Sequence, residues 1–400
     1  MSYAQLPALE GGSPVRKESL PFYRTSHGEE EFQSVLDTLR SGWLTVGPKT
    51  SEFRKEFLLH LGLDHGVPVN SCTSAMFLAL KVLGLKPGDE VITSPNTFTS
   101  TVSVIHHTGA VPVLADIEET TFGLDPEATK AAITDRTRAI LAVHYGGQPC
   151  YIEKILDLVN SHDLFLIEDV AHSFGARLDG NHMGRFGHFG AFSFYATKNL
   201  STGEGGFLTC RTEAMEKEAA LMGFHGMGRD AWKRYTDRGS WYYEVDRFGY
   251  KFNMSDIQAA LGLVQLRRAE ELLEKRTLIA DRYHKAFGSE EALAVPQTRE
   301  NALHSWHLFV LRLRPDALRI HRDHFLRALS AEGIIPSLHF IPIHHHPVHN
   351  QFFGDIRSRL PAAERFYQSC FSLPLFPSME DEEIGQVIEA VLKLVRYYRF

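Results

Sequence analysis

The chain has 400 residues, of which 44% are hydrophobic and 23% are charged, and its formal net charge is −7. These values are ordinary for a folded globular protein and give no sign of the basic surface that attracts nucleic acid or anionic membranes. No apolar run approaches the length of a membrane span, and the N-terminus lacks the apolar segment of a signal peptide. We therefore expect a cytoplasmic protein with neither a membrane nor a nucleic-acid partner. Its four cysteines, which lack CxxC spacing, should be reduced thiols.

The length exceeds that of a typical single domain, so we expect a large domain followed by a smaller one. Residues 1–20, rich in Gly, Pro and Ser, should form an arm, residues 21–262 the large domain and residues 263–400 the small one. Helical spacing of apolar residues predicts helices over 29–41 and 53–61, joined by a turn-forming stretch.

From Val67 onward, short apolar runs alternate with helical segments. We predict strands over 67–70, 91–94, 111–116, 139–144, 164–169, 191–195 and 206–210, and helices over 74–83, 99–108 and 152–161. This alternation indicates an α/β fold with a largely parallel sheet covered by helices on both faces. Ligands of such folds bind where the carboxyl ends of the strands open.

The C-terminal part has fewer signals. Ser255 can cap a helix, and the pattern that follows predicts a long connecting helix that continues to about Phe287. Beyond it we expect a strand over 307–314 and helices over 323–333 and 380–398.

A lysine and an acidic residue stand at the ends of two predicted strands. Lys198 follows the run 191–195 and precedes a glycine-rich turn, and Asp169 ends the run 164–169. On its own, such a lysine is usually solvated and such an aspartate often caps a helix. Together they match the needs of pyridoxal 5'-phosphate (PLP): an amine to form a Schiff base, and a carboxylate to keep the pyridine nitrogen protonated.

Other polar and aromatic residues lie at the same predicted sheet edge. Thr73 and Ser74 open a helix, where free N–H groups and the helix dipole favour a phosphate, although both are also good helix caps. Phe98 could lie on the cofactor ring, although taken alone it is more often a core residue. His172 could contact the ring or its phenolic oxygen, or be structural. Several features that each match part of one cofactor make a stronger signal than any single motif.

A histidine-rich stretch, residues 344–349, invites a metal hypothesis. Its sequence, HHHPVH, does not have the spacing of a zinc site. We therefore expect no metal and instead interpret the stretch as a loop near the substrate.

The chain resembles the DegT/StrS family of PLP-dependent sugar-nucleotide aminotransferases from about Leu44 to Pro377. The matching pieces are WLTVGPKTSEF, NSCTSAMFLAL, PNTFTSTVSVI, IEDVAHSFGA, FSFYATKNLSTGEGG, GYKFNMSDIQAALGLVQL and SLPLFPSM. The blocks HGMGRDAWKR, GYKFN and SWHLFVLRL look most like the branch that aminates a UDP-4-keto-pentose.

The resemblance implies PLP-dependent transferase fold type I, with a mostly parallel seven-stranded sheet in the large domain, a smaller α/β C-terminal domain, and a homodimer with sites at the interface. It also implies roles for individual residues. Lys198 would be the Schiff-base lysine, Asp169 the partner of the pyridine nitrogen and Phe98 the stacking ring. The phosphate would be held by Thr73, Ser74 and Ser193. His172 stands where many relatives have Gln, and Lys251 stands where many have an Asn that reaches the phosphate of the neighbouring subunit.

The implied reaction moves the amino group of L-glutamate to a keto sugar nucleotide, with pyridoxamine 5'-phosphate (PMP) as the intermediate cofactor form, for amino sugar and polysaccharide biosynthesis. Carbon 4 is the expected position. Two alternatives stay open: a PLP-dependent sugar dehydratase or lyase, and a regulatory protein that keeps the fold without turnover. The presence of Lys198 favours transamination, because one offshoot of the family that performs dehydration has His there.

Overall fold

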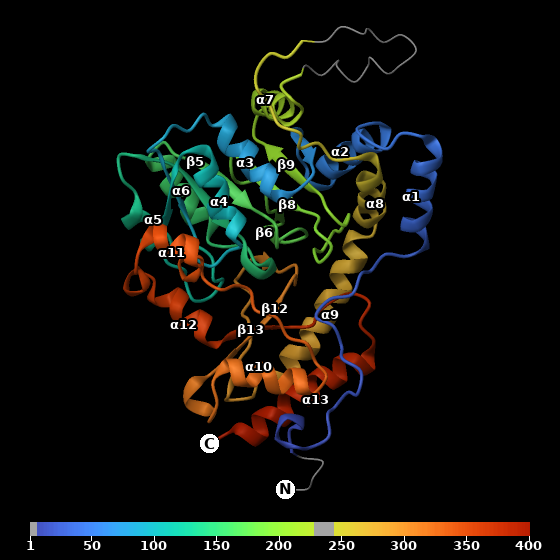
Figure 1. The fold of residues 1–400 in the computed structure, drawn as a ribbon, viewed down its shortest axis with the longest axis vertical. Helices are drawn as coiled ribbons and strands as arrows, with labels where there is room; N and C mark the ends of the chain where they lie inside the picture. Colours follow the sequence, from blue (N-terminus) through green and yellow to red (C-terminus); the bar gives the residue numbers. More distant parts are fainter. Residues whose placement is uncertain (1–5, 228–243) are drawn as a thin grey trace.

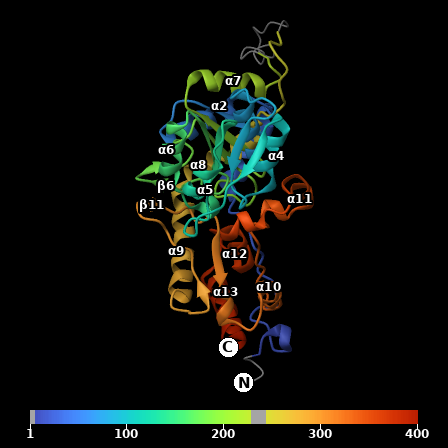
Figure 2. The same cartoon turned by 90° about the vertical axis from the view of Figure 1, so that its left-hand side faces the viewer.

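The computed structural model describes residues 6–227 and 244–400. The chain forms a large domain built on one sheet and a smaller C-terminal domain, with the first described residues and the C-terminus at the small-domain end (Figure 1). Figure 2 shows the two parts one above the other. Most of the block HGMGRDAWKR lies outside the described residues.

The large domain contains a seven-stranded sheet. Across the sheet the order is β1 (Gly66–Val69), β9 (Gly206–Cys210), β8 (Phe189–Ser193), β5 (Phe165–Asp169), β4 (Thr137–Val143), β2 (Glu90–Thr93) and β3 (Val111–Leu114). The strands from β8 to β3 pair in parallel, whereas β9 is antiparallel to both of its neighbours. The prediction of an α/β fold with a mostly parallel sheet is thus confirmed, and each predicted strand overlaps one that is observed.

Helices cover both faces of this sheet, as predicted. One face packs against α3 (Cys72–Val82), α4 (Thr99–Thr108) and α7 (Glu213–Gly223). The other face packs against α2 (Pro48–Leu61), α6 (Ile152–Ser161) and α8 (Asp256–Arg267), and α1 (Glu29–Ser41) lies on α8. Apolar side chains on both sides of each strand explain why the strand sequences are continuous apolar runs.

Helix α2 begins five residues earlier than expected, at Pro48. The carboxylate of Asp256 accepts hydrogen bonds from the backbone N–H groups of Lys49 and Thr50, at 3.0 and 2.9 Å. These two groups have no partner within a helix, so a side chain from a distant helix completes the N-terminus. Because the capping side chain is 206 residues from Thr50 in the sequence, the residues around Pro48 give no sign of this cap.

The long connecting helix predicted from Ser255 is in fact two helices, α8 and α9 (Ala269–Phe287). Arg268 separates them with φ −95° and ψ 6°. Its guanidinium donates hydrogen bonds to the Ser26 carbonyl (3.2 Å) and to the buried carboxylate of Glu31 (2.7 Å). These long-range contacts accompany a break that no glycine or proline announces in the sequence.

The small domain surrounds a three-stranded antiparallel sheet, β10 (Leu293–Ala294), β12 (Phe309–Leu313) and β13 (Cys370–Leu373). Helices α9, α10 (Arg322–Ala331) and α13 (Asp381–Tyr398) pack on it. The predicted strand and two helices of this region are present, whereas β13, α11 (Pro347–Phe353) and α12 (Pro361–Ser369) were not predicted. The predicted domain limits stay a proposal.

The N-terminal segment lies on the small domain. Leu20 is fully buried in its core and bridges to Ile334, and the carboxylate of Glu332 accepts the N–H groups of Ala8 and Val15 at 2.8 and 2.9 Å. Another apolar cluster combines side chains from both domains, among them Tyr145 and Leu308. The two domains therefore pack against each other near the carboxyl end of β4.

Two further expectations concern the whole chain. In the described residues, no helix combines the length and apolar character needed to cross a bilayer. The four cysteines are all buried and free, and their reduced state in the cell stays a prediction.

Candidate active site

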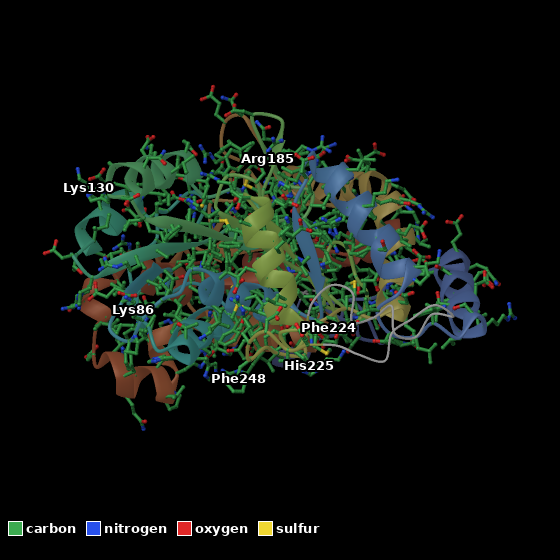
Figure 3. All side chains as sticks on the ribbon, turned by 90° about the horizontal axis from the view of Figure 1, so that it is seen from above. Lys86, Lys130, Arg185, Phe224, His225 and Phe248 are labelled. Carbon is green, nitrogen blue, oxygen red and sulfur yellow. The ribbon has the colours of Figure 1, made fainter. Side chains whose placement is uncertain are left out.

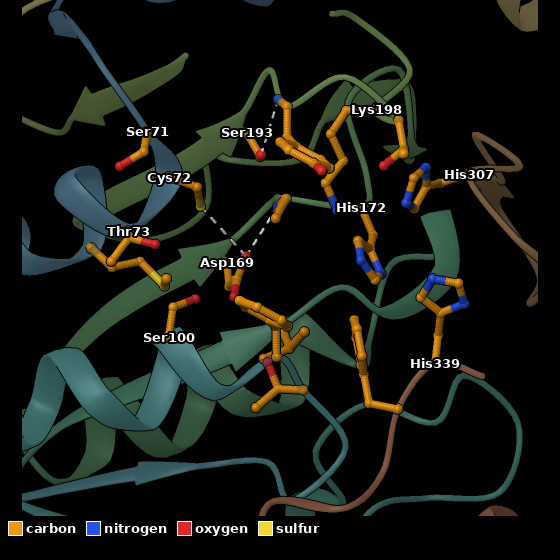
Figure 4. Close-up of a pocket in the computed structure, with 18 of the residues that line it drawn as sticks. Ser71, Cys72, Thr73, Ser100, Asp169, His172, Ser193, Lys198, His307 and His339 are labelled. Atoms are coloured by element: carbon orange, nitrogen blue, oxygen red, sulfur yellow. Dashed lines mark hydrogen bonds between the residues drawn. The ribbon is translucent and has the colours of Figure 1, made fainter. Parts of the chain in front are cut away.

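A cavity of about 490 Å³ lies at the carboxyl end of β5, between the carboxyl ends of the sheet strands and the small domain. Figure 4 shows the side chains that surround it. Among the predicted site residues it is lined by Thr73, Phe98, Asp169, His172, Ser193 and Lys198. Residues from four separate stretches of the large domain thus meet at one place, as the sheet topology predicts.

Asp169 ends β5 and is 5% exposed. Its Oδ1 accepts the N–H of Ala171 at 3.0 Å, and its Oδ2 accepts the hydroxyl of Thr101 at 3.0 Å. Burial raises the pKa of Asp169, and these hydrogen bonds together with the charge of Lys198 act in the opposite direction. A cationic partner in the cavity would stabilise this buried carboxylate, and a protonated pyridine nitrogen is such a partner.

Lys198 enters the cavity from the loop that follows β8 (Figure 4). Burial lowers the pKa of the Lys198 amine from 10.5 to about 8, although the negative charge of Asp169 favours its protonated form. In the described part of the chain no hydrogen bond or ion pair engages this amine. A partly neutral, unpaired amine in a cavity is a suitable nucleophile for an aldehyde.

The start of α3 faces the same cavity. Ser71 caps the helix by accepting the N–H of Ser74 at 3.1 Å, and Cys72 and Thr73 line the cavity beside it. A Cβ on Gly206 would lie 2.7 Å from the Cys72 nitrogen, so glycine there lets β9 approach the helix start. This arrangement of free N–H groups and hydroxyls fits a phosphate.

Two predicted phosphate ligands do not line the cavity. The Ser74 hydroxyl donates to Asn70 Oδ1 at 2.7 Å and is buried, so its side-chain placement gives its predicted role no support. Lys251 lies with its Nζ 4.5 Å from the ring centroid of Phe224, a residue labelled in Figure 3. Its contact with the phosphate of a neighbouring subunit stays a prediction.

Phe98 and His172 both border the space where the cofactor ring would lie. Phe98 is 58% exposed at the start of α4, so it is not a core residue of this chain. His172 accepts the N–H of Gly146 on Nδ1 at 3.3 Å, which leaves the proton of the neutral ring on Nε2. Burial, followed by the charge of Lys198, holds the pKa of His172 well below its usual range. His172 is therefore a neutral hydrogen-bond donor.

Three lining residues that sequence reasoning gave no role come from the small domain: His307, His339 and Phe340. Phe340 stacks on the ring of His172, with centroids 5.4 Å apart. His307 belongs to the block SWHLFVLRL, which indicated only a resemblance to one branch of the family and gave His307 no role. No local sequence pattern marks His339. Because a second domain brings them to the sheet edge, the strand pattern of the first could not reveal them.

The histidine-rich stretch lies next to the cavity rather than in it. His344 Nε2 and His345 Nε2 both approach Glu364 Oε1, at 2.7 and 2.6 Å, and the potential ligand atoms lie within 4.8 Å of one another. Two imidazole N–H groups that donate to one carboxylate oxygen account for this arrangement. The expectation of no metal stays a prediction.

The cavity as a whole fits PLP. Among the residues that the structure describes, it provides an amine without a hydrogen-bond partner, a buried carboxylate without a cationic partner in direct contact, and a helix N-terminus approached by a glycine of β9. An exposed aromatic ring, that of Phe98, and the neutral ring of His172 line the same cavity.

Comparison with known proteins agrees with this geometry. The model of the DegT/DnrJ/EryC1/StrS aminotransferase family matches residues 25–392. The spore coat polysaccharide biosynthesis protein SpsC of Bacillus subtilis is 47% identical over 382 residues, which cover 95% of this chain and 98% of SpsC.

Solved structures show the same similarity. The putative sugar aminotransferase Spr1654 of Streptococcus pneumoniae, in its PMP form, is 34% identical with a TM-score of 0.89, over 94% of this chain and 99% of that one. It has also been solved in a PLP form. PseC of Helicobacter pylori, an aminotransferase of pseudoaminic acid biosynthesis, is 27% identical with a TM-score of 0.88, over 95% of this chain and all of that one, 100%.

Proposed function

Because the chain belongs to the DegT/DnrJ/EryC1/StrS aminotransferase family, and is thus a PLP-dependent sugar aminotransferase, we propose that it transfers the amino group of L-glutamate to carbon 4 of a nucleotide-linked keto sugar. The products would be an amino sugar nucleotide and 2-oxoglutarate. One observation carries the proposal: Lys198 and Asp169 face a single cavity that also contains the start of α3. The donor, the nucleotide and carbon 4 rest on the sequence resemblance.

PLP would supply an aldehyde whose carbon takes up the amino group and a ring that accepts electrons from the reacting carbon. We assign its binding to residues that line the cavity. The N–H groups at the start of α3, with Thr73 and Ser193, would hold the phosphate, and Asp169 would pair with the pyridine nitrogen. Phe98 would cover one face of the ring, and His172 would donate from Nε2 to its phenolic oxygen.

Lys198 would have two tasks in the reaction. Its amine first holds the cofactor and is released when the amino donor takes its place. The free Nζ then accepts the proton of the donor α-carbon and delivers it to the cofactor carbon that bears the amino group, as a general base and then an acid. A pKa of about 8 suits both directions of this proton transfer near neutral pH.

The keto sugar would receive the amino group by the same steps in reverse. Lys198 Nζ would then take a proton from the cofactor and deliver it to carbon 4 of the sugar. The similarity to SpsC supports a product destined for a surface polysaccharide. The four free cysteines agree with a cytoplasmic site of action, where thiols stay reduced.

We also propose that the enzyme is a homodimer with its sites at the interface. Helix α1 supports this, because Phe32, Leu36 and Leu39 are 53%, 43% and 47% exposed on it. Their spacing of three to four residues places them along one side of the helix. An apolar stripe of this kind is typical of a surface that another chain covers.

The test is to incubate the PLP-loaded enzyme and L-glutamate with a panel of keto sugar nucleotides and to identify the products by mass spectrometry. The proposal expects one sugar to gain an amino group at carbon 4 while 2-oxoglutarate appears in equal amount. Loss of water or another fragment from the sugar, without 2-oxoglutarate, would identify a dehydratase or lyase. No conversion of any sugar by protein that binds PLP through Lys198 would favour the regulatory alternative.

A further inference from the structure

The segment from His304 to His307 reaches the cavity from the small domain. Its backbone is docked on the loop that follows β4: the N–H of Ser305 donates to the Gly147 carbonyl at 2.8 Å, and the N–H of Leu308 donates to the Gly146 carbonyl at 3.0 Å. Figure 4 shows His307 beside Lys198 and His172. This segment thus brings one small-domain imidazole next to the reactive amine.

The conformation of this segment is costly and is held from two sides. Trp306 has a φ of +47°, which non-glycine residues rarely adopt. The fully buried guanidinium of Arg276 donates to the Trp306 carbonyl at 3.1 Å, and the amide of Asn199, the residue after Lys198, donates to the Ser305 carbonyl at 2.6 Å. Backbone strain that the surroundings enforce is common where a side chain must be held in place for function.

The ring of His307 has an unpaired nitrogen in this position. The residue is 6% exposed and lines the cavity, and its Nδ1 is enclosed without a hydrogen-bond partner in the described part of the chain. Burial, followed by the charge of Lys198, holds the pKa of His307 well below its usual range. A neutral ring keeps one proton, and leaving an N–H buried without an acceptor is rarer than leaving an acceptor unpaired. The proton therefore belongs on Nε2.

Neighbouring histidines have the same character. His172 lies with its ring centroid 4.5 Å from that of His307 and also has its proton on Nε2. Burial and the charge of Lys198 lower the pKa of His339 to about 3, so this ring is neutral too. Among the described residues, the cavity is lined by these histidines and by no arginine. Its side-chain N–H donors beside Lys198 are thus imidazoles.

We propose that His307 binds the α-carboxylate of the amino donor through its Nε2–H. This inference rests on the proposed aminotransferase function. The α-carbon of the donor must lie within reach of Lys198 Nζ, so the carboxylate on that carbon must lie beside the same amine. An ionised acceptor strengthens a hydrogen bond from a neutral N–H, and here it would occupy a donor that the protein itself leaves unused.

The variants His307→Leu and His307→Gln test this assignment in the holoenzyme. Leucine removes the donor at similar volume, whereas the amide nitrogen of glutamine can reach the place of Nε2. Binding of 2-oxoglutarate to the PMP form is measured by calorimetry, and the reaction of the PLP form with L-glutamate by stopped-flow absorbance. His307→Leu should weaken the first and slow the second by roughly 10- to 100-fold, the loss expected for a hydrogen bond to a charged group. His307→Gln should recover part of this.

His304→Asn serves as the matched control. His304 is buried in the same segment but does not line the cavity, and it accepts the N–H of Trp306 on Nδ1 at 2.9 Å, which an asparagine oxygen can replace. This variant should bind 2-oxoglutarate with the affinity of the wild type and react with L-glutamate at the rate of the wild type. Thermal unfolding and the visible absorption of the bound cofactor establish that each variant is folded and loaded.

Unchanged donor constants in a loaded, folded His307→Leu variant would overturn the inference, as would an equal loss of affinity for the donor and for the keto sugar nucleotide. Failure of the proposed function looks different. If the wild-type protein ignores L-glutamate but reacts with another amino acid, only the identity of the donor is wrong. Because every α-amino acid carries the same carboxylate, the His307 comparison is then made with that amino acid.

Discussion

The amine of Lys198 and the carboxylate of Asp169 face one cavity, and each favours the charged form of the other. Burial acts against both charges, so that the pKa of Lys198 falls to about 8 and that of Asp169 rises. Neither residue is well solvated in the protein without cofactor. PLP would use both groups, because it forms a bond with one and an ion pair with the other.

Replacing Lys198 by alanine should abolish the visible absorption of protein-linked PLP and reduce turnover to background. The side chain is the only lysine among the described residues that line the cavity. Absorbance of the variant after incubation with PLP and gel filtration measures the link. Lys130→Ala, at an exposed position on α5 (Pro126–Ala132), is the control and should behave as wild type. Retention of both properties in Lys198→Ala would contradict the assignment.

The same lysine should destabilise the apoprotein. Its pKa is about 8 when folded and 10.5 ordinarily, so between these pH values the unfolded chain binds more protons and stability rises with pH. Lys198→Met should therefore stabilise the apoprotein by about 1–3 kcal/mol below pH 8, and the gain should vanish towards pH 10.5. Urea unfolding at several pH values measures it. A gain that does not change with pH would point to packing instead.

Asp169→Asn should leave PLP linked to Lys198 but reduce turnover by roughly 10²- to 10³-fold, because a neutral amide does not stabilise a protonated pyridine nitrogen. The pKa of Lys198 in the apoprotein should also fall further, since the carboxylate raises it at present. The pH dependence of PLP attachment gives the second quantity. Turnover near the wild-type rate would show that the cofactor does not need this anion.

Thr73 and Ser74 should differ although they are adjacent. Thr73 lines the cavity, so Thr73→Val should weaken PLP binding by about tenfold. Ser74 is bonded to Asn70 and Ser71, so Ser74→Ala should instead lower the free energy of unfolding by about 1 kcal/mol. Equilibrium dialysis of PLP and thermal unfolding separate the two effects. The reverse result would restore Ser74 as a phosphate ligand.

Leu36→Glu should weaken the proposed dimer, because a charge would enter the apolar stripe of α1. Light scattering of the purified protein should show a shift from dimer to monomer, together with a loss of turnover. Leu278→Glu, which alters a leucine 65% exposed on α9, is the control and should leave the mass unchanged. A wild-type protein that is monomeric at all concentrations would refute the proposal directly.

The sequence predicted the parts of the fold that depend on local pattern. The strands are short apolar runs, such as Gly206–Cys210, that alternate with helices along the chain. Lys198 follows the carboxyl end of β8, and Asp169 is the last residue of β5. The break at Arg268 and the cap of α2 by Asp256 were missed because both depend on contacts between distant segments. Strand β13 was missed in a region with few local signals, although it pairs with β12 along four residues.

The candidate site divides in the same way. Residues at strand ends of the large domain could be found, since their position follows from the topology of the sheet. His307 and His339 could not, because only the docking of the small domain brings them to Lys198. Ser74 shows the opposite case: its residue type suits a phosphate, but the rotation of the first helical turn points it at Asn70.

The hydrogen bond from Asn199 to Ser305 has a mechanical consequence. It ties the residue next to the reactive lysine to the small domain, and the shared apolar cluster with Tyr145 and Leu308 reinforces that tie. A hinge motion that swung the small domain away would tug on the loop that carries the amine. Substrates should therefore enter and leave through the existing opening of the cavity, while the two domains stay in a fixed arrangement and move as one rigid body.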